Sequence, residues 1–171
     1  MGCGAFGCCG DYFSEAGFGV IKFFQMIFVV LLAGVVLSGC RLEVDGGPPE
    51  IRYGDSLCAY CGMIISDARF ATATILMGDR GHEPYVFDDF NCQKTFDLNH
   101  AEDQVVDRWC HDYESSSWIQ MENAWFVQSD QLRTPMASNL ASFAGKESAD
   151  AAAESLGGVV LDFEAFQDLE E

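Results

Sequence analysis

The first forty residues constrain the fold of this chain most, because they leave a much shorter segment to build a core. Residues 23–37 read FFQMIFVVLLAGVVL, an uncharged run that follows Lys22 and ends before small residues. A transmembrane helix needs about 20 apolar residues, so this run is too short to span a bilayer comfortably. The charged start, apolar middle and small-residue end are typical of a secretory signal. An uncleaved anchor is the alternative, and both interpretations place the rest of the chain outside the cytoplasm.

The end of this run predicts how the exported part is attached. Residues 37–40, LSGC, resemble the lipobox of bacterial lipoproteins, in which the cysteine, here Cys40, is lipidated and becomes the first mature residue. We therefore expect residues 1–39 to be a leader and signal peptide, 40–54 the lipidated cysteine with a flexible tether, and 55–168 the folded domain. A flexible tether of this length spans about 20 Å, which would keep the domain close to a membrane facing the periplasm or the cell exterior.

The charge of the chain excludes one class of partner. There are 27 acidic residues against 9 lysines and arginines, giving a formal net charge of −18. Such a surface repels phosphate backbones, so we expect no binding to nucleic acid. The same charge is equally consistent with simple solubility, so it indicates no partner by itself.

The domain shows the pattern of strand, strand and helix twice. The first copy runs through strands at residues 70–77 and 85–87 into a helix that Asp88 or Asp89 can cap. The second copy has strand-like segments followed by an alanine-rich helix that ends at Gly157. Its expected elements are strands at 118–119, 124–127, 140–143 and 159–161, a helix at 147–156 and a short closing helix at 163–169. We therefore predict a small α+β domain of two related ββα-type halves.

Cysteine chemistry in the domain centres on residues 56–70, SLCAYCGMIISDARF. A thioredoxin-like Cys-x-x-Cys precedes a long helix, whereas Cys58 and Cys61 lead into a strand, so a redox pair is disfavoured but stays open. Structural zinc needs four ligands, and the remaining candidates, Cys92, Cys110 and His111, are scattered in the sequence. A plain disulfide between Cys58 and Cys61 is a third possibility in an oxidising compartment.

Met63 favours a softer metal than zinc. Thiolate and thioether ligands together select copper(I), and the glycine at position 62 allows the backbone to turn so that two sulfurs can point at one atom. A methionine is more often a core residue than a ligand. Met63 is a candidate copper ligand only because it directly follows Cys61 and Gly62.

Several short motifs together resemble the NosL-type lipoproteins, which are accessory proteins of nitrous oxide reductase. The matching motifs, in order, are CAYCGM at 58–63, RFA at 69–71, FDD at 87–89, AWFV at 124–127, PM at 135–136 and LGGV at 156–159. The resemblance covers about residues 55–168. One departure is Ala137, which stands where a glycine is common.

The resemblance implies a copper(I)-binding protein that is not an enzyme. It makes Cys61, Met63 and Met136 candidate copper ligands, with Cys58 as a fourth, and it implies nitrous oxide reductase or its copper-site assembly machinery as the partner. The alternative function is an extracytoplasmic thiol-disulfide protein that keeps the copper-site cysteines of a partner reduced. Copper binding uses Met63 and Met136, whereas dithiol exchange does not need them.

Overall fold

The structure, a computed structural model, describes residues 47–169. The predicted leader, the signal peptide, Cys40 and the first part of the tether lie outside the described residues. Within residues 47–169 no helix has the length and apolar character needed to cross a bilayer. Ile51 packs against a hydrophobic cluster, so the folded part starts a little before residue 55.

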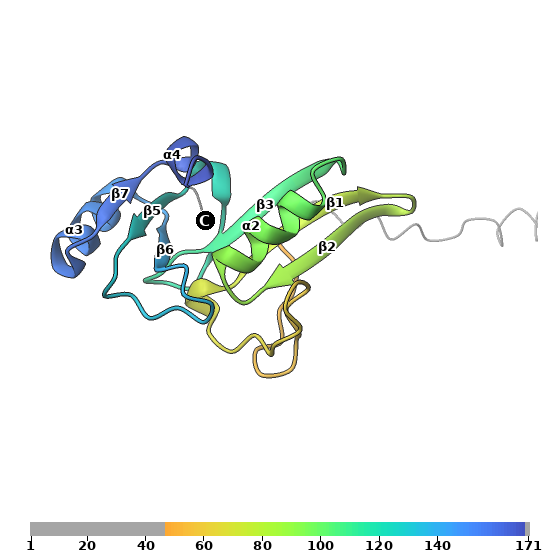
Figure 1. The fold of residues 1–171 in the computed structure, drawn as a ribbon, viewed down its shortest axis with the longest axis horizontal. Helices are drawn as coiled ribbons and strands as arrows, with labels where there is room; N and C mark the ends of the chain where they lie inside the picture. Colours follow the sequence, from red (N-terminus) through yellow and green to blue (C-terminus); the bar gives the residue numbers. More distant parts are fainter. Residues whose placement is uncertain (1–46, 170–171) are drawn as a thin grey trace, which may run out of the picture. The chain divides into compact units, whose positions relative to one another are not determined.

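The first half is a four-stranded antiparallel sheet with one helix (Figure 1). A short 3-10 helix, η1 (Ala68–Phe70), precedes β1 (Thr72–Gly78), β2 (Gly81–Phe87), α2 (Phe90–Asn99), β3 (Val105–His111) and β4 (Trp118–Gln120). The strand order is β2-β1-β3-β4. The strand β1 therefore lies between β2 and β3, and its first five residues are all buried.

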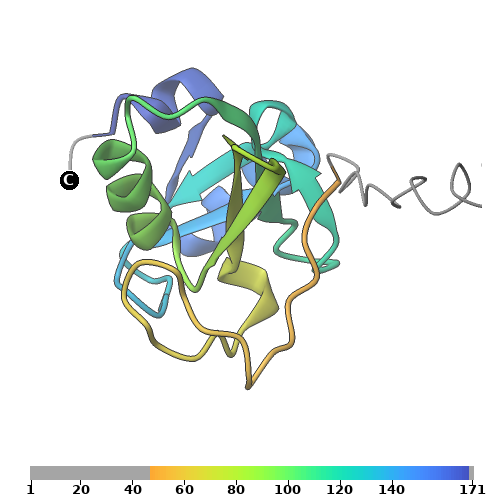
Figure 2. The ribbon, with the colours of Figure 1, turned by 90° about the vertical axis from the view of Figure 1, so that its right-hand side faces the viewer.

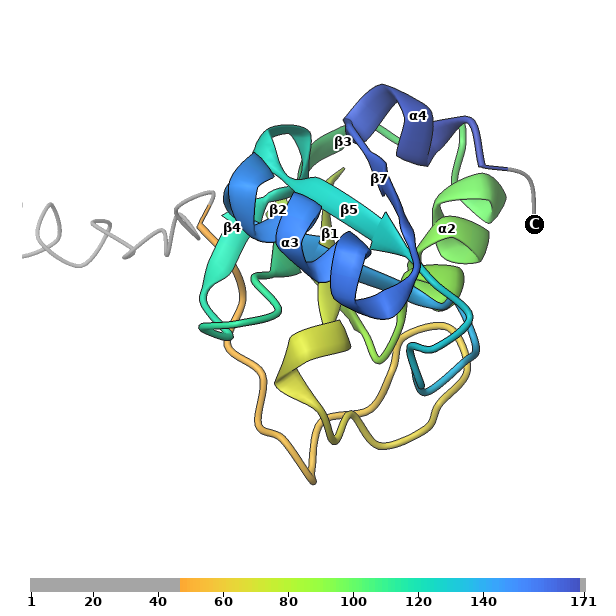
Figure 3. The same cartoon turned by 90° about the vertical axis from the view of Figure 1, so that its left-hand side faces the viewer.

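The second half repeats this arrangement with shorter strands. After η2 (Met121–Asn123) come β5 (Trp125–Gln128), β6 (Leu140–Phe143), α3 (Lys146–Leu156), β7 (Val159–Leu161) and α4 (Phe163–Gln167). The order β6-β5-β7 matches β2-β1-β3, and all of these pairs are antiparallel. Figure 3 shows α3 lying across this sheet. The predicted α+β class with two related halves is confirmed, and each half is ββαβ.

The ends of the helices follow the capping residues that the sequence offers. Asp89 caps α2 by accepting a hydrogen bond from the Asn91 amide, and Asp162 does the same for α4 through Ala165. Gly157 ends α3 in the left-handed conformation, with φ of 60°. These local signals explain why the predicted helices fall close to the observed ones.

The strand β3 was not predicted from the sequence. Two charged residues, Asp107 and Arg108, stand at its centre and interrupt the apolar alternation that marks a strand. The fold accepts Arg108 there because its Nε lies 2.6 Å from Oδ2 of Asp97 on α2. A contact made only after folding therefore supports this strand.

The halves join along the end of β3 and through a cluster of aromatic rings. The Tyr113 amide donates to the Ser142 carbonyl at 2.7 Å, and the Asp112 carboxylate accepts from the Ala144 amide at 2.9 Å. The rings of Phe90, Phe126 and Phe166 pack on one another with centroids 4.3 to 5.8 Å apart. The two halves consequently share a core.

Candidate metal centre

The loop before β1 holds Cys58 and Cys61 in a tight turn. The Cys58 amide donates to the Met63 carbonyl at 2.8 Å, and the Gly62 amide donates to the Cys58 carbonyl at 2.9 Å. Gly62 has φ of 72°, a conformation that costs a residue with a side chain about 1–2 kcal/mol. Leu57 and Ile64 form an isolated antiparallel bridge that closes the turn at its base. Glycine thus allows the sharp reversal between the two cysteines and Met63.

A third thiol completes the cluster from α2. The Sγ atoms of Cys58, Cys61 and Cys92 all lie within 4.8 Å of one another. Cys58 and Cys92 are buried and Cys61 is half-buried, and all three are free thiols. The expectation that Cys92 is scattered away from the other cysteines is wrong. Its position on the buried face of a helix that follows Phe87 and the two aspartates was the signal available in the sequence.

The surroundings of the three thiols differ in their effect on ionisation. Burial raises the pKa of Cys58, but backbone N–H groups of Cys61, Asp88 and Tyr60 hydrogen-bond its sulfur and hold the pKa below its ordinary value. Burial, followed by the nearby Cys58 charge, raises the pKa of Cys92 well above its ordinary range. The fold therefore favours the thiolate form at Cys58 and the thiol form at Cys92, and a bound cation would favour the thiolate form at both.

The two aspartates beside the cluster hold backbone together. Asp88 accepts a hydrogen bond from the Ser66 amide at 3.3 Å, which ties the cysteine loop to the start of α2. Asp89 caps α2 with one carboxylate oxygen and accepts from the Met136 amide with the other, at 2.9 Å. Both carboxylates therefore have structural partners, and burial raises the pKa of Asp88.

Met136 contacts the first half through its hydrogen bond to the Asp89 carboxylate. Asp89 holds its amide, the Asn91 side chain donates to its carbonyl at 3.1 Å, and the half-buried Met136 packs against the hydrophobic cluster that contains Cys58 and Cys92. Figures 1 and 2 show the loop between β5 and β6 meeting the loop before β1 near the start of α2. The fold thus brings a segment of the second half to the cysteine cluster.

Backbone strain is concentrated next to Met136. Three residues other than glycine have positive φ in residues 47–169, and two of them, Ala137 at 58° and Asn139 at 57°, lie within three positions after Met136. Strained conformations of this kind persist only where the surrounding structure fixes them, and they gather at functional sites. The positive φ of Ala137 also explains why a glycine suits this position.

The other candidate residues lie differently. Met63 is 53 % exposed and therefore stands at the solvent side of the cysteine loop. Cys110 belongs to a separate cluster with Phe90 and Phe126, where burial raises its pKa to about 12. Cys110 therefore lies outside the group of three neighbouring thiols.

His111, named above as a possible zinc ligand, is buried. Its Nδ1 lies 2.8 Å from the Ala71 carbonyl, and its Nε2 lies 3.0 Å from the Tyr53 hydroxyl. A carbonyl only accepts, so Nδ1 carries the proton and Nε2 accepts from Tyr53. Burial lowers the pKa of His111, in keeping with a neutral ring. Both nitrogens thus have partners within the fold.

Comparisons with known proteins agree with this architecture. The crystal structure of the copper chaperone NosL from Shewanella denitrificans superposes with a TM-score of 0.62 at 22% sequence identity, covering 74% of this chain and 99% of that one. At this identity the likeness shows a shared fold. No curated protein matches the chain.

The family comparison covers nearly all of the described domain. The sequence model of the NosL family matches residues 51–169, from Ile51, which packs against the core, to the residues just after α4. The resemblance found in the short motifs is therefore confirmed over the whole domain. The chain belongs to the NosL family.

Proposed function

We propose that this protein is a copper(I) carrier, anchored outside the cytoplasm through lipidated Cys40, that delivers copper for maturation of nitrous oxide reductase. The observation that carries the proposal is the convergence of Cys58, Cys61 and Cys92 within 4.8 Å. The related protein from Shewanella denitrificans is described as a copper chaperone, which supports the same cargo here. The role is that of a carrier and requires no catalytic residue.

The candidate ligands divide into a buried and a more accessible group. Cys58 and Cys92 are each 2% exposed and would hold the ion from the protein side. Cys61 is half-buried and Met63 is exposed, so these sulfurs would face an acceptor. Met136, packed against the same cluster, is the candidate thioether from the second half. Soft sulfur ligands suit copper(I), and an ion held by only two or three of them can be released to an acceptor.

Zinc is the competing cargo, because three neighbouring thiols are also a common part of zinc sites. The argument against zinc was that the cysteines are scattered in the sequence. It fails for Cys92, whose sulfur lies near those of Cys58 and Cys61. The thioethers of Met63 and Met136 are soft donors, which favour copper(I) over zinc. Affinity for the two ions therefore separates these interpretations.

The thiol-disulfide alternative is supported by one feature, the lowered pKa of Cys58 within a Cys-x-x-Cys sequence. Against it, the pair lies in a turn closed by Leu57 and Ile64 instead of at the start of a helix. An oxidised Cys58–Cys61 pair should lose copper and regain it on reduction. Air-exposed protein that keeps both thiols free and still binds copper would rule out this pairing.

A competition titration tests the proposal. Fully reduced protein is titrated with copper(I) against a chromogenic chelator, and we expect about one ion bound tightly, with zinc bound much more weakly. Cys61→Ser should abolish tight binding, because a hydroxyl is a poor donor for a soft ion. Unchanged affinity in Cys61→Ser would remove this residue from the site, and weak binding by the unaltered protein would overturn the proposed function.

Delivery needs its own measurement. Copper-loaded protein is mixed with copper-free nitrous oxide reductase, the two proteins are separated, and the copper content of the enzyme reports whether its copper centres fill. We expect filling from the loaded protein and none from the Cys61→Ser variant treated in the same way. Tight copper binding without any transfer would leave a copper-binding protein and contradict the delivery step.

A further inference from the structure

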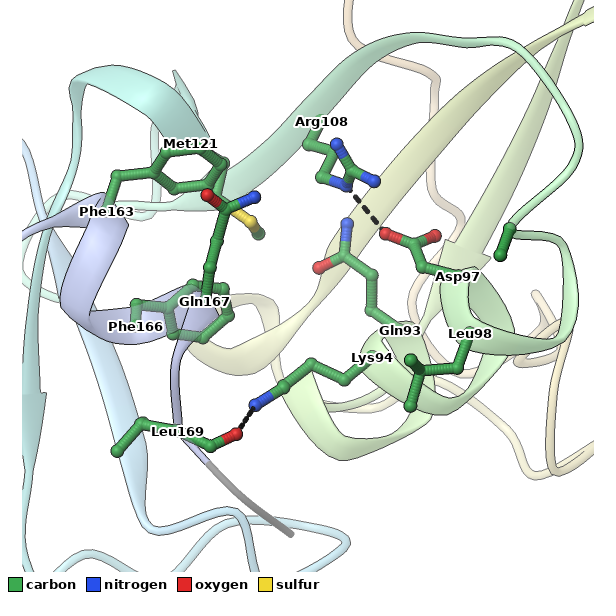
Figure 4. Close-up of a pocket in the computed structure, with 11 residues that line it drawn as sticks. Gln93, Lys94, Asp97, Leu98, Arg108, Met121, Phe163, Phe166, Gln167 and Leu169 are labelled. Carbon is green, nitrogen blue, oxygen red and sulfur yellow. Dashed lines mark hydrogen bonds and ion pairs between the residues drawn. The ribbon is translucent and has the colours of Figure 1, made fainter.

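A second site lies between α2 and α4, apart from the cysteine cluster. The cavity has a volume of about 630 Å³, and neither a cysteine nor Met136 lines it. Figure 4 shows Arg108 and Asp97 on one wall and Met121, Phe163 and Phe166 on the other. A volume of this size falls within the range of small-molecule sites, which is about 300–1,000 Å³.

Arg108 is held in this cavity by a chain of hydrogen bonds. Its Nε donates to Oδ2 of Asp97 at 2.6 Å, and the other oxygen of Asp97 accepts from the Thr74 hydroxyl at 2.9 Å. The buried Gln93 amide in turn donates to the Thr74 hydroxyl and to the Ala73 carbonyl, at 3.0 and 2.9 Å. The position of the guanidinium group is therefore set by residues of β1 and α2.

The terminal amino groups of Arg108 are left for a ligand. In the part of the chain that the structure describes, Asp97 takes the Nε proton and no side chain or carbonyl accepts from the two terminal nitrogens. The Arg108 side chain is 25% exposed, so this edge is accessible. The planar edge of a guanidinium group matches a carboxylate, which can accept two parallel hydrogen bonds.

The opposite wall is apolar and firmly placed. Phe166 stacks on Phe126 at 4.3 Å, and Met121 is buried beneath it in the same cluster. The Lys94 ammonium group donates to the Leu169 carbonyl and lies 5.6 Å from the Phe166 ring centroid, which fixes α4 beside α2. A ligand for this site thus needs an apolar body as well as an anionic group.

We propose that this cavity binds a small monocarboxylate with an apolar body, such as a medium-chain fatty acid. The carboxylate would pair with the terminal nitrogens of Arg108, and the hydrocarbon would lie against Met121, Phe163 and Phe166. A single negative charge is favoured because the chain carries a formal charge of −18, which repels multiply charged anions. This site is independent of copper binding.

Calorimetric titration of the full chain with decanoate tests the proposal. We expect saturable binding at one site, and binding at least about tenfold weaker in Arg108→Gln. Arg80→Gln is the matched control, since it removes the same charge from the exposed turn between β1 and β2. Decan-1-ol has the same hydrocarbon without the charge and should bind at least about tenfold more weakly than decanoate.

A blocking variant keeps the test decisive if Arg108→Gln does not fold. Gln167 lines the cavity from α4 and is exposed, so Gln167→Trp should fill the space and abolish decanoate binding while circular dichroism remains native. The proposal is overturned if the unaltered protein shows no saturable binding. It is also overturned if decanol binds as well as decanoate, or if a folded Arg108→Gln or Gln167→Trp variant binds as well as Arg80→Gln.

Discussion

The two halves have the same strand order but use their helices differently. In the first half, α2 is buried on two sides, because Phe90 packs into the shared aromatic cluster while Cys92 and Phe96 belong to the cluster under the cysteine loop. In the second half, α3 buries only the alanines Ala149 and Ala153, against its own sheet. The group of three thiols therefore lies beside the helix that contacts two clusters, and the second half adds the turn that contains Met136.

The largest expected effect comes from removing the sulfur that α2 contributes. Cys92→Ser should weaken copper(I) binding at least about a hundredfold, or roughly 2.7 kcal/mol, because a hydroxyl replaces a soft buried donor. The measurement is the same chelator competition. Cys110→Ser changes a buried cysteine of the same half outside the cluster, and it should leave the affinity unchanged. Equal affinity in the two variants would reduce the site to Cys58 and Cys61.

The next largest effect is expected on stability, from a substitution of Asp112 at the junction between the halves. Its carboxylate accepts hydrogen bonds from the Ser115 amide and hydroxyl and from the Ala144 amide. Asp112→Asn leaves one of these amides facing an NH₂ group, which should cost about 1–3 kcal/mol in the free energy of unfolding. Urea denaturation measures this loss, and Asp130→Asn, an exposed aspartate, should show no comparable change.

The same residue gives the junction a pH dependence. Burial raises the pKa of Asp112, but the hydrogen bonds from Ser115 and Ala144 outweigh it and leave the pKa below its ordinary value. A lowered pKa in the folded state contributes stability above the unfolded value of about 4, and this contribution disappears as the pH falls through the folded pKa. As the pH is lowered from about 5, the free energy of unfolding should therefore fall more in the unaltered protein than in Asp112→Asn. An equal fall in the two proteins, measured by urea denaturation at each pH, would contradict this role of Asp112.

A smaller effect tests whether the second half contributes to the metal site. Met136→Leu roughly conserves apolar volume and should cost less than about 1.5 kcal/mol in stability. Copper(I) binding should nevertheless weaken by at least about tenfold, equivalent to roughly 1.4 kcal/mol. Met121→Leu, in the shared cluster, and Met77→Leu, on β1, serve as controls. Unchanged affinity in stable Met136→Leu protein would confine the ligands to the first half.

The smallest effect concerns the strained turn that carries Met136. Ala137 has φ of 58°, and glycine there relieves a strain of about 1–2 kcal/mol while losing about 0.4–1 kcal/mol through the unfolded chain. Ala137→Gly should therefore raise the free energy of unfolding by about 0.5–1 kcal/mol, measured by thermal denaturation. Ala101→Gly, in an exposed turn without positive φ, should lower it instead. If Ala137→Gly lowers the free energy of unfolding as Ala101→Gly does, the backbone at Ala137 is not strained.

Local chemistry in the sequence determined the elements and their repetition. Glycines, capping aspartates and runs of β-branched residues act within a few positions of the chain, so the helices at 90–99 and 146–156 and most strands could be predicted. The Cys-x-x-Cys-Gly-Met sequence likewise pointed to the loop that holds two of the three neighbouring thiols. The strand β3 could not be predicted, because the partner that accommodates Arg108 lies on another element.

The composition of the candidate site was decided by the tertiary structure. Cys92 stands more than thirty positions beyond Cys58, and only the crossing of α2 over the first sheet brings the three sulfurs within 4.8 Å. Met136 approaches them because Asp89 caps α2 and binds the Met136 amide at the same time. The pairing of Arg108 with Asp97 likewise forms only when β3 and α2 meet. Sequence patterns record what neighbours along the chain prefer, whereas these sites depend on contacts between distant segments, which the packing of the two halves alone selects.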